Sequence, residues 1–541
     1  MRNVLVVTIG IALFSVGCVR QQRFRFVPAT TACFDDRASV VPVNGPPDQK
    51  PSLDCGHSQY KLAFIEFDQQ GKAFDADQEA VALKLLDREK ARVKGGKIIT
   101  VVYVHGWKNN ASEALPGGKP KDVEKFQRAL LELGYRASKA AQDAGTAPVP
   151  VVGVYMGWRG KTLMGPSWFN FVSLWGRRNT ANRVGSGADL APILNRIVEK
   201  TNSGNGGSRV LMIGHSFGAR VLEHAIETKK VTLYDAVPGT GVVNPRVDLV
   251  LYVNSANDSR LSMARVQELQ TTKVEAHHPD YDPNECGAAA GSSAAIDEET
   301  RAARCRDYPL LVAITSKGDQ ATKRLLPIAN TINGDDLPPK VSANLPDLPT
   351  SDDFADPLPS RRTYRKVAAG HFAFLQSHVI REVSCPRLPS VAQRDEAATI
   401  EARIDEAVEK AVAAALGKPS AEERRAQEKL AAAKKTAAEA KLRMEKALHP
   451  VCPANDPTCR FVFRTLGEQP ACYRADARSA VGGRSPFNRT PFWIMDVEPS
   501  VIKDHGDIWN VSFVEMLGQL MAPRGFFDPG AGRMQLRATS P

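Results

Sequence analysis

Apolar runs separated by helical patterns recur along most of the chain. The expected strands cover residues 61–67, 97–104, 149–156, 210–213, 247–253, 310–315 and 490–497. Most contain almost no polar residue, which is typical of strands covered on both faces of a parallel sheet, whereas 61–67 alternates and suits an edge strand. Helical spacing is found at 78–93, 121–144, 190–201, 219–228 and 511–521. This alternation predicts an α/β fold with a mostly parallel sheet flanked by helices.

A region of different character interrupts this pattern at 392–449, which is rich in Ala, Glu, Lys and Arg. Apolar residues there recur every four positions, as in a helix with one apolar stripe. Gly417 and Pro419 end a first helix, and a capping box at 420–423 begins a second. We expect a helical hairpin with coiled-coil character, which is either a solvated arm or a lid or partner-binding arm.

These patterns divide the chain into one domain and several appended segments. The sheet domain is expected at 59–385 and 486–525, interrupted by an insertion at 386–485 that holds the hairpin and a cysteine-containing loop. Residues 18–58 are rich in Pro, Asp and Gln, which predicts a tether. Residues 526–541 are expected to form a loose tail.

The first residues resemble a bacterial lipoprotein signal. Arg2 precedes an apolar run at 4–16, too short to span a bilayer as a mature helix, and small residues then precede Cys18. This pattern predicts that residues 1–17 are cleaved and that Cys18 is lipidated. Ser15 stands where the pattern prefers leucine, so a plain signal peptide or an uncleaved anchor remains an alternative. The expected location is the bacterial cell envelope, by a lipid anchor on the outer-membrane or periplasmic side, or outside the cell.

Net charge and cysteine content narrow the possible binding partners, cellular compartment and metal sites of the protein. The net charge of +11 suits an anionic membrane surface, but no basic patch interleaved with aromatic residues supports nucleic-acid binding. Apart from Cys18, the cysteines form an even set that suits disulfides in an oxidising compartment. We expect Cys33 to pair with Cys55 and Cys286 with Cys305. The remaining four stay open: Cys385, Cys452, Cys459 and Cys472. A zinc site is less favoured, because no two close C-x-x-C spacings occur, and no metal or organic cofactor is expected.

The chemistry-bearing motif is Gly-His-Ser-Phe-Gly at 214–218. It lies between an apolar strand and a helical pattern, which is the context of a nucleophile elbow. A serine on such a tight turn leaves no room for side chains two positions before and after it, which explains Gly214 and Gly218. The pattern predicts that Ser216 is a nucleophile whose Oγ lies at the end of the strand, where a substrate can reach it, above a helix N-terminus.

A serine nucleophile needs a base and a group that orients the base. We expect Asp319 to be the carboxylate because it directly follows the end of a strand, with Asp258 as its rival. We expect His505 to be the base because it follows the last strand. His371 and His378 are its competitors, and the segment before His371 makes a poor buried strand.

The oxyanion that forms on the substrate needs backbone donors. The N–H of Phe217, directly after the nucleophile, is one candidate. The N–H of Trp107, in the loop after the strand at 97–104, is the other. His105 is expected to shape that loop and not to transfer protons.

These motifs resemble the α/β-hydrolases, and more narrowly a bacterial subgroup. The shared segments are Tyr-Val-His-Gly-Trp-Lys-Asn-Asn at 103–110, Gly-Trp-Arg-Gly at 157–160, Gly-His-Ser-Phe-Gly-Ala-Arg at 214–220 and His-Gly-Asp-Ile at 505–508. The resemblance covers about 60–385 and 486–525. It implies an α/β-hydrolase fold and the chain order nucleophile, acid, histidine. The long gap between Asp319 and His505 departs from the family.

The triad and the resemblance, together with the lipoprotein-like signal, lead to the hypothesis of a secreted, membrane-tethered serine hydrolase that cleaves a carboxylic ester or lipid substrate through an acyl-enzyme. Acyltransferases and lipases share this fold, so fold alone does not fix the substrate. A different hypothesis is a non-catalytic envelope scaffold whose hairpin binds a protein partner. A complete set of Ser216, Asp319 and His505 argues against it.

Overall fold

The computed structural model describes the sheet domain and segments packed against it. With short gaps inside them, the described ranges are 23–27, 50–54, 59–112, 122–274, 309–327, 367–383, 472–484, 490–521, 526 and 535–537.

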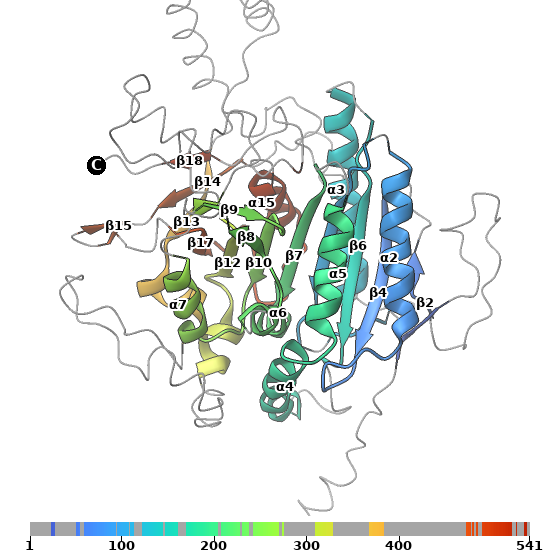
Figure 1. The fold of residues 1–541 in the computed structure, drawn as a ribbon. Helices are drawn as coiled ribbons and strands as arrows, with labels where there is room; N and C mark the ends of the chain where they lie inside the picture. The colour runs from blue at the N-terminus through green and yellow to red at the C-terminus, as the bar shows by residue number, and fades with distance from the viewer. Residues whose placement is uncertain are drawn as a thin grey trace, which may run out of the picture.

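A mixed, mostly parallel sheet of 11 strands forms the centre of the molecule (Figure 1). From one edge to the other its strands are β3 (Leu53–Asp54), β4 (Tyr60–Phe67), β6 (Val151–Trp158), β5 (Ile99–Val104), β7 (Arg209–His215), β10 (Leu249–Val253), β12 (Leu311–Ser316), β17 (Phe492–Val497), β13 (His378–Val383), β14 (Cys472–Ala477) and β18 (Gln535–Arg537). The strands from β4 to β13 run parallel to their neighbours. An α/β architecture is therefore present, as the apolar runs predict.

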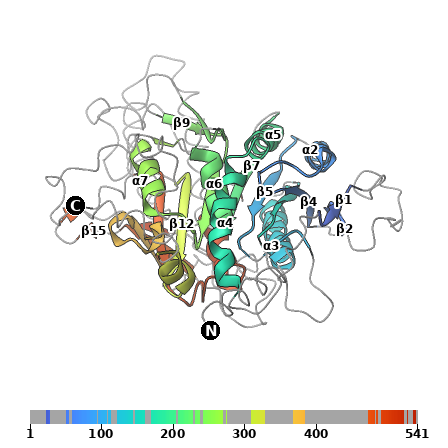
Figure 2. The same ribbon diagram turned by 90° about the horizontal axis from the view of Figure 1, so that it is seen from below.

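Helices cover both faces of this sheet (Figure 2). One face carries α2 (Ala76–Ala91), α4 (Phe169–Gly185), α5 (Leu190–Asn202), α6 (Phe217–Glu227) and α7 (Ser259–Glu268). The other carries α3 (Asp122–Asp143) and α15 (Val511–Met521). Successive side chains of a strand point to opposite faces. Accordingly, Val102 packs with the first set of helices, and Tyr103 packs with the second.

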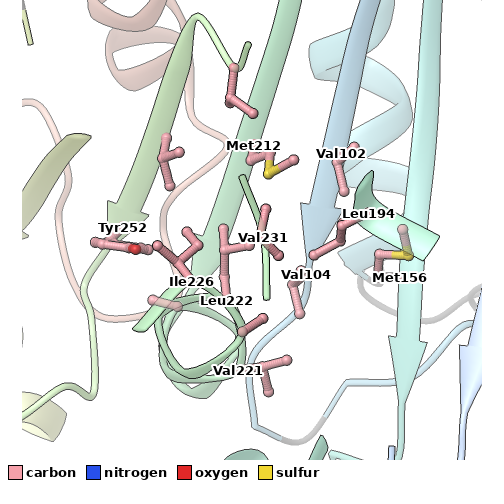
Figure 3. Packing of buried hydrophobic residues seen from close by; sticks show 14 of the residues in the cluster. Val102, Val104, Met156, Leu194, Met212, Val221, Leu222, Ile226, Val231 and Tyr252 are labelled. Carbon is pink, nitrogen blue, oxygen red and sulfur yellow. The ribbon is translucent and has the colours of Figure 1, made fainter. Parts of the chain in front are cut away.

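The helix that follows Ser216, α6, is firmly packed (Figure 3). Val221, Leu222 and Ile226 of α6 belong to the same hydrophobic cluster as Met212 of β7 and Tyr252 of β10, and all five side chains are buried. Burying a side chain of this size stabilises a fold by about 1.5–3 kcal/mol. The helix that directly follows Ser216 is therefore anchored in the core of the domain.

The expected tether needs correction at two places. Arg25–Phe26 (β1) pairs with Lys50–Pro51 (β2), and Phe26 and Leu53 are buried. Glu66 of β4 holds the first segment by accepting a hydrogen bond of 2.8 Å from the Arg25 N–H. The strand expected at the edge, β4, is nearly all buried, because these segments and the short β3 cover it. The alternation of apolar and polar residues in β4 comes from Lys61 and Glu66. Glu66 is buried, and it accepts the hydrogen bond from the Arg25 N–H.

The other edge also differs from expectation. Residues 472–477, placed by the sequence in the insertion, form β14 and pair antiparallel with β13. Residues 535–537, placed in a loose tail, form β18 and pair with β14. The sequence patterns also miss α4, α7 and the three-stranded sheet of β8 (Tyr234–Ala236), β9 (Val242–Pro245) and β11 (Lys273–Val274). Their apolar residues are too few or too irregularly spaced to show a period.

Several expectations lie outside the described residues: the signal peptide, Cys18, the two disulfides and the helical hairpin at 392–449. Within the described part of the chain, no helix combines the length and the apolar character needed to cross a membrane.

Candidate active site

Ser216 stands on a sharp turn between β7 and α6. Its φ of 55° lies in the left-handed region that non-glycine residues rarely adopt. Hydrogen bonds hold this conformation: the Ser216 N–H donates to the Val253 carbonyl at 3.0 Å, and the Ser216 carbonyl accepts from Ala256 N–H at 3.2 Å. Such a strained residue persists only where its surroundings fix it, and this is common at functional sites.

The glycines of the turn have the steric role expected of them. A Cβ on Gly218 would lie 2.0 Å from the Val104 carbonyl oxygen, and one on Gly214 would lie 2.5 Å from Ala219 Cα. Neither backbone neighbour can move without displacing the strand or the helix. The motif is therefore confirmed as a close-packed strand–turn–helix.

The three residues expected to form a triad lie in one hydrogen-bonded chain. His505 Nε2 is 2.7 Å from Ser216 Oγ, and His505 Nδ1 is 2.9 Å from Asp319 Oδ2. They follow β7, β12 and β17, whose carboxyl ends lie at the same edge of the sheet. Residues far apart in the sequence thus meet where loops of a parallel sheet converge.

The Asp319 carboxylate is fully buried and has partners on both oxygens. Oδ1 accepts hydrogen bonds from the N–H groups of Ala321 (2.9 Å) and Thr322 (3.1 Å). Oδ2 accepts from the Thr322 hydroxyl and from His505. Burial would raise the Asp319 pKa, but the hydrogen bonds from His505 and Thr322 outweigh it, and the pKa is lowered. The carboxylate is therefore ionised, so His505 carries its proton on Nδ1 and accepts from Ser216 with Nε2.

The backbone of His505 is held from the other side. Its carbonyl accepts a hydrogen bond from Asn254 Nδ2 at 3.1 Å and lies 2.8 Å from His215 Nε2. Burial, with a smaller effect of His505, lowers the His215 pKa to about 3. A neutral His215 with its proton on Nε2 can donate to this carbonyl. Asn254, with a φ of 45°, also accepts from the Ser316 N–H at 2.9 Å.

The loop that carries Asp319, after β12, packs directly on the loop that carries His505, after β17. The Ser316 hydroxyl donates to the Ile502 carbonyl, and a Cβ on Gly318 would come within 2.2 Å of the Lys503 carbonyl oxygen. This contact needs a glycine. It fixes the two loops as a unit despite the long stretch of sequence between them.

The two Gly-Trp motifs meet behind the expected oxyanion loop. His105 Nε2 accepts from the Trp158 N–H at 3.0 Å, while Trp158 Nε1 donates to the His105 carbonyl at 2.8 Å. The His105 ring stacks on Trp158 with an interplanar angle of 7°. Burial lowers the His105 pKa to about 4. His105 is therefore neutral at pH 7 and joins two loops, in agreement with a shaping role.

A small pocket opens beside Ser216. The residues lining it are Trp107, Ser216, Phe217, Ala256, Ala321, Thr322, Leu325, Leu326 and His505. Most are apolar, and none is Lys, Arg, Asp or Glu. Phe217 opens α6, so its backbone N–H has no acceptor within the helix. The pocket suits an uncharged, apolar group next to the serine.

The rival residues have other partners. Asp258 is buried among arginines, with Arg220 Nη1 at 3.5 Å and Arg178 Nη2 at 3.8 Å. His378 Nδ1 lies 2.9 Å from Ser377 Oγ, and His371 Nε2 lies 3.0 Å from Thr322 Oγ1. Within the described part of the chain, His505 is the one candidate histidine within hydrogen-bonding distance of Ser216 Oγ, and Asp319 is the one candidate carboxylate that contacts His505.

The sequence patterns do not identify three residues that contact the site: His215, Asn254 and Thr322. They indicate His371 only as a competing base, not as a partner of Thr322. A weak signal exists for Asn254, which directly ends a buried apolar strand. Thr322 follows Asp319 within one helical turn, a spacing at which a hydroxyl can reach back to a carboxylate.

No family model, curated protein or solved structure matches the chain.

Proposed function

We propose that the protein is a serine hydrolase of the α/β-hydrolase fold that cleaves carboxylic esters through an acyl-enzyme. The observation that carries this proposal is the chain from Ser216 through His505 to Asp319, with hydrogen bonds of 2.7 and 2.9 Å. Ser216, the first residue of this hydrogen-bonded chain, lines the apolar pocket. A merely structural serine has no need of a strained turn, a histidine and a buried carboxylate behind it.

The geometry suits the following reaction. Ser216 Oγ attacks the ester carbonyl while His505 Nε2 takes its proton, and the Asp319 carboxylate stabilises the imidazolium that forms. The N–H groups of Phe217 and Trp107 are the proposed donors to the oxyanion. His505 returns the proton to the leaving alcohol, and water then releases the acid by the same steps in reverse. Hydrolysis of the acyl-enzyme regenerates Ser216.

The decisive test is covalent labelling of the full chain with a fluorophosphonate probe. We expect the wild type to be labelled and Ser216→Ala to be inert, with His505→Ala labelled at least roughly a hundredfold more slowly. Ser186→Ala is the matched control, because this serine is exposed and its hydroxyl donates to the Asn182 carbonyl at the end of α4. Circular dichroism must show that the variants are folded. A folded wild type that does not react, or a reactive Ser216→Ala, would exclude the proposal.

We also propose attachment of this enzyme to the bacterial cell envelope through a lipid on Cys18. The support is the lipoprotein-like sequence at 1–18. Expressed with labelled palmitate, the wild type should incorporate label and sediment with membranes. Cys18→Ala should lose both properties, and Cys33→Ala should keep them. Label retained by Cys18→Ala would exclude this site.

A further inference from the structure

The Thr322 hydroxyl has two partners. It donates a hydrogen bond to Asp319 Oδ2, and its oxygen lies 3.0 Å from His371 Nε2. A hydroxyl has one proton, and an ionised carboxylate can only accept. The proton of Thr322 therefore points to Asp319, and His371 Nε2 must carry a proton and donate to Thr322. The directions of the two hydrogen bonds that lead from His371 Nε2 through the Thr322 hydroxyl to Asp319 Oδ2 are thus fixed.

His371 is held in a defined place by its own turn, η3 (Ala369–His371). A Cβ on Gly370 would lie only 1.8 Å from Thr315 Oγ1, so this turn is pressed against β12. Gln376 Nε2 donates to the Gly370 carbonyl at 2.6 Å. Burial lowers the His371 pKa, which favours a neutral ring with a single proton.

We propose that Thr322 and His371 are positioning residues of the active site, which act in series on the carboxylate of Asp319. This inference rests on the proposed function. Thr322 fills the remaining acceptor direction of Oδ2, beside His505, while backbone N–H groups hold Oδ1. His371 in turn holds the Thr322 hydroxyl in the rotamer that points to Asp319. The carboxylate then stays in the plane that orients His505 toward Ser216.

The position of Thr322 gives this arrangement a second consequence. Thr322 lies in the π-helical turn η1 (Ala321–Leu325), which also supplies pocket wall. Single π-helical turns are frequent at functional sites. Loss of the Thr322 hydroxyl should lower the rate of the chemical step, while the apolar wall that binds substrate remains.

Paired variants of the full chain test the inference. Thr322→Val removes the hydroxyl at nearly constant volume, and Thr322→Ser keeps it. His371→Phe removes the donor, and His371→Gln retains an N–H near the position of Nε2. The rate of fluorophosphonate labelling and the kcat and KM for a p-nitrophenyl ester are measured for each, with thermal unfolding as a check of the fold.

We expect Thr322→Val to lower the labelling rate and kcat roughly ten- to a hundredfold, with little change of KM, since hydrogen bonds to charged groups have this weight. Thr322→Ser should recover most of the rate, and His371→Gln should exceed His371→Phe. The double variant Thr322→Val/His371→Phe should be no slower than Thr322→Val, because residues acting in series are not additive.

The outcomes are distinguishable. A labelled wild type with equally fast Thr322→Val overturns the positioning role and leaves the proposed function standing. A double variant whose loss is the product of the two single losses shows that His371 does not act through Thr322. A folded wild type that does not label overturns the proposed function and this inference with it.

Discussion

Asn254, directly after β10, donates a hydrogen bond of 3.1 Å from Nδ2 to the backbone carbonyl of His505 in the loop after β17. Its Oδ1 accepts from the N–H of Ser316, the last residue of β12, which precedes the turn that holds Asp319. One amide side chain thus joins the loop of His505 to the strand end that precedes Asp319. This is a backbone contact, so it holds the His505 loop without taking part in proton transfer.

Replacing Asn254 by Asp should impair the reaction. Aspartate keeps the acceptor for Ser316 but loses the donor and brings negative charge toward the His505 carbonyl. A lost hydrogen bond of about 1.4 kcal/mol corresponds to about a tenfold fall in kcat. Steady-state ester hydrolysis measures it, and Asn254→Gly, which tolerates the positive φ, shows the loss of the whole side chain. Wild-type kcat in Asn254→Asp would show that the contact is dispensable.

Glycine at position 106 should be required for reactivity. A Cβ there would lie 2.9 Å from both His215 Nδ1 and Ser216 Cβ, so Gly106→Ala should displace the nucleophile or the expected oxyanion loop. We expect a fall in labelling of at least roughly tenfold. Gly176→Ala is the control, because a Cβ at this exposed helical position meets nothing within 4 Å, and it should gain up to about 1 kcal/mol of stability. Equal labelling of the two variants would contradict the prediction.

The apolar pocket should limit the length of the group it accepts. Leu325 and Leu326 belong to its wall, and shortening Leu325 to Ala makes room next to Ser216. We expect kcat/KM for p-nitrophenyl octanoate to rise relative to the acetate by roughly tenfold, as for a few added methylene groups. Leu83→Ala on α2, away from the site, is the control. An unchanged ratio in Leu325→Ala would show that the group lies elsewhere.

Buried histidines should make the fold sensitive to acid. Burial lowers the pKa of His378 to about 3, below the value of about 6.5 for an unfolded chain. Between these values the unfolded state binds the extra proton, so stability is complete above about pH 6.5 and is lost as pH falls toward about 3. His105 and His215 act in the same direction.

Unfolding in urea at several pH values between about 7 and 4 measures this effect. His378→Phe preserves the stacking on Trp493, whose ring centroid lies 4.1 Å away, but removes one titrating group. The slope of unfolding free energy against pH should become shallower by up to about 1.4 kcal/mol per pH unit. An identical slope would mean that His378 is not buried as a neutral ring.

The sequence predicts the centre of the sheet well because buried parallel strands are continuous apolar runs. Each of β5, β6, β7, β10, β12 and β17 falls on an expected strand within a few residues. The edge is different: β14 and β18 lie in segments that the sequence places in an insertion and a tail. Edge strands have no such run, and their pairing depends on tertiary context.

The sequence likewise predicts one part of the candidate site and not the other. The meeting of Ser216, Asp319 and His505 follows from their places after parallel strands. The roles of Thr322 and His371 do not, because they depend on side-chain rotamers and on a turn pressed against β12. From the sequence, His371 is a candidate base only because it is a histidine. The order of residues does not reveal that it lies next to Thr322, whose hydroxyl donates to Asp319.

The three central residues come from two lengths of chain. Ser216 and Asp319 precede β13, whereas His505 follows β14, and the two lengths meet where β12 pairs with β17 along six residues and β13 with β14. A break in the covalent chain between residues 384 and 471 would therefore separate nucleophile from base while sparing every strand named above. Two such fragments, produced together, would regain reactivity only by completing one sheet, which makes the triad a reporter of their association.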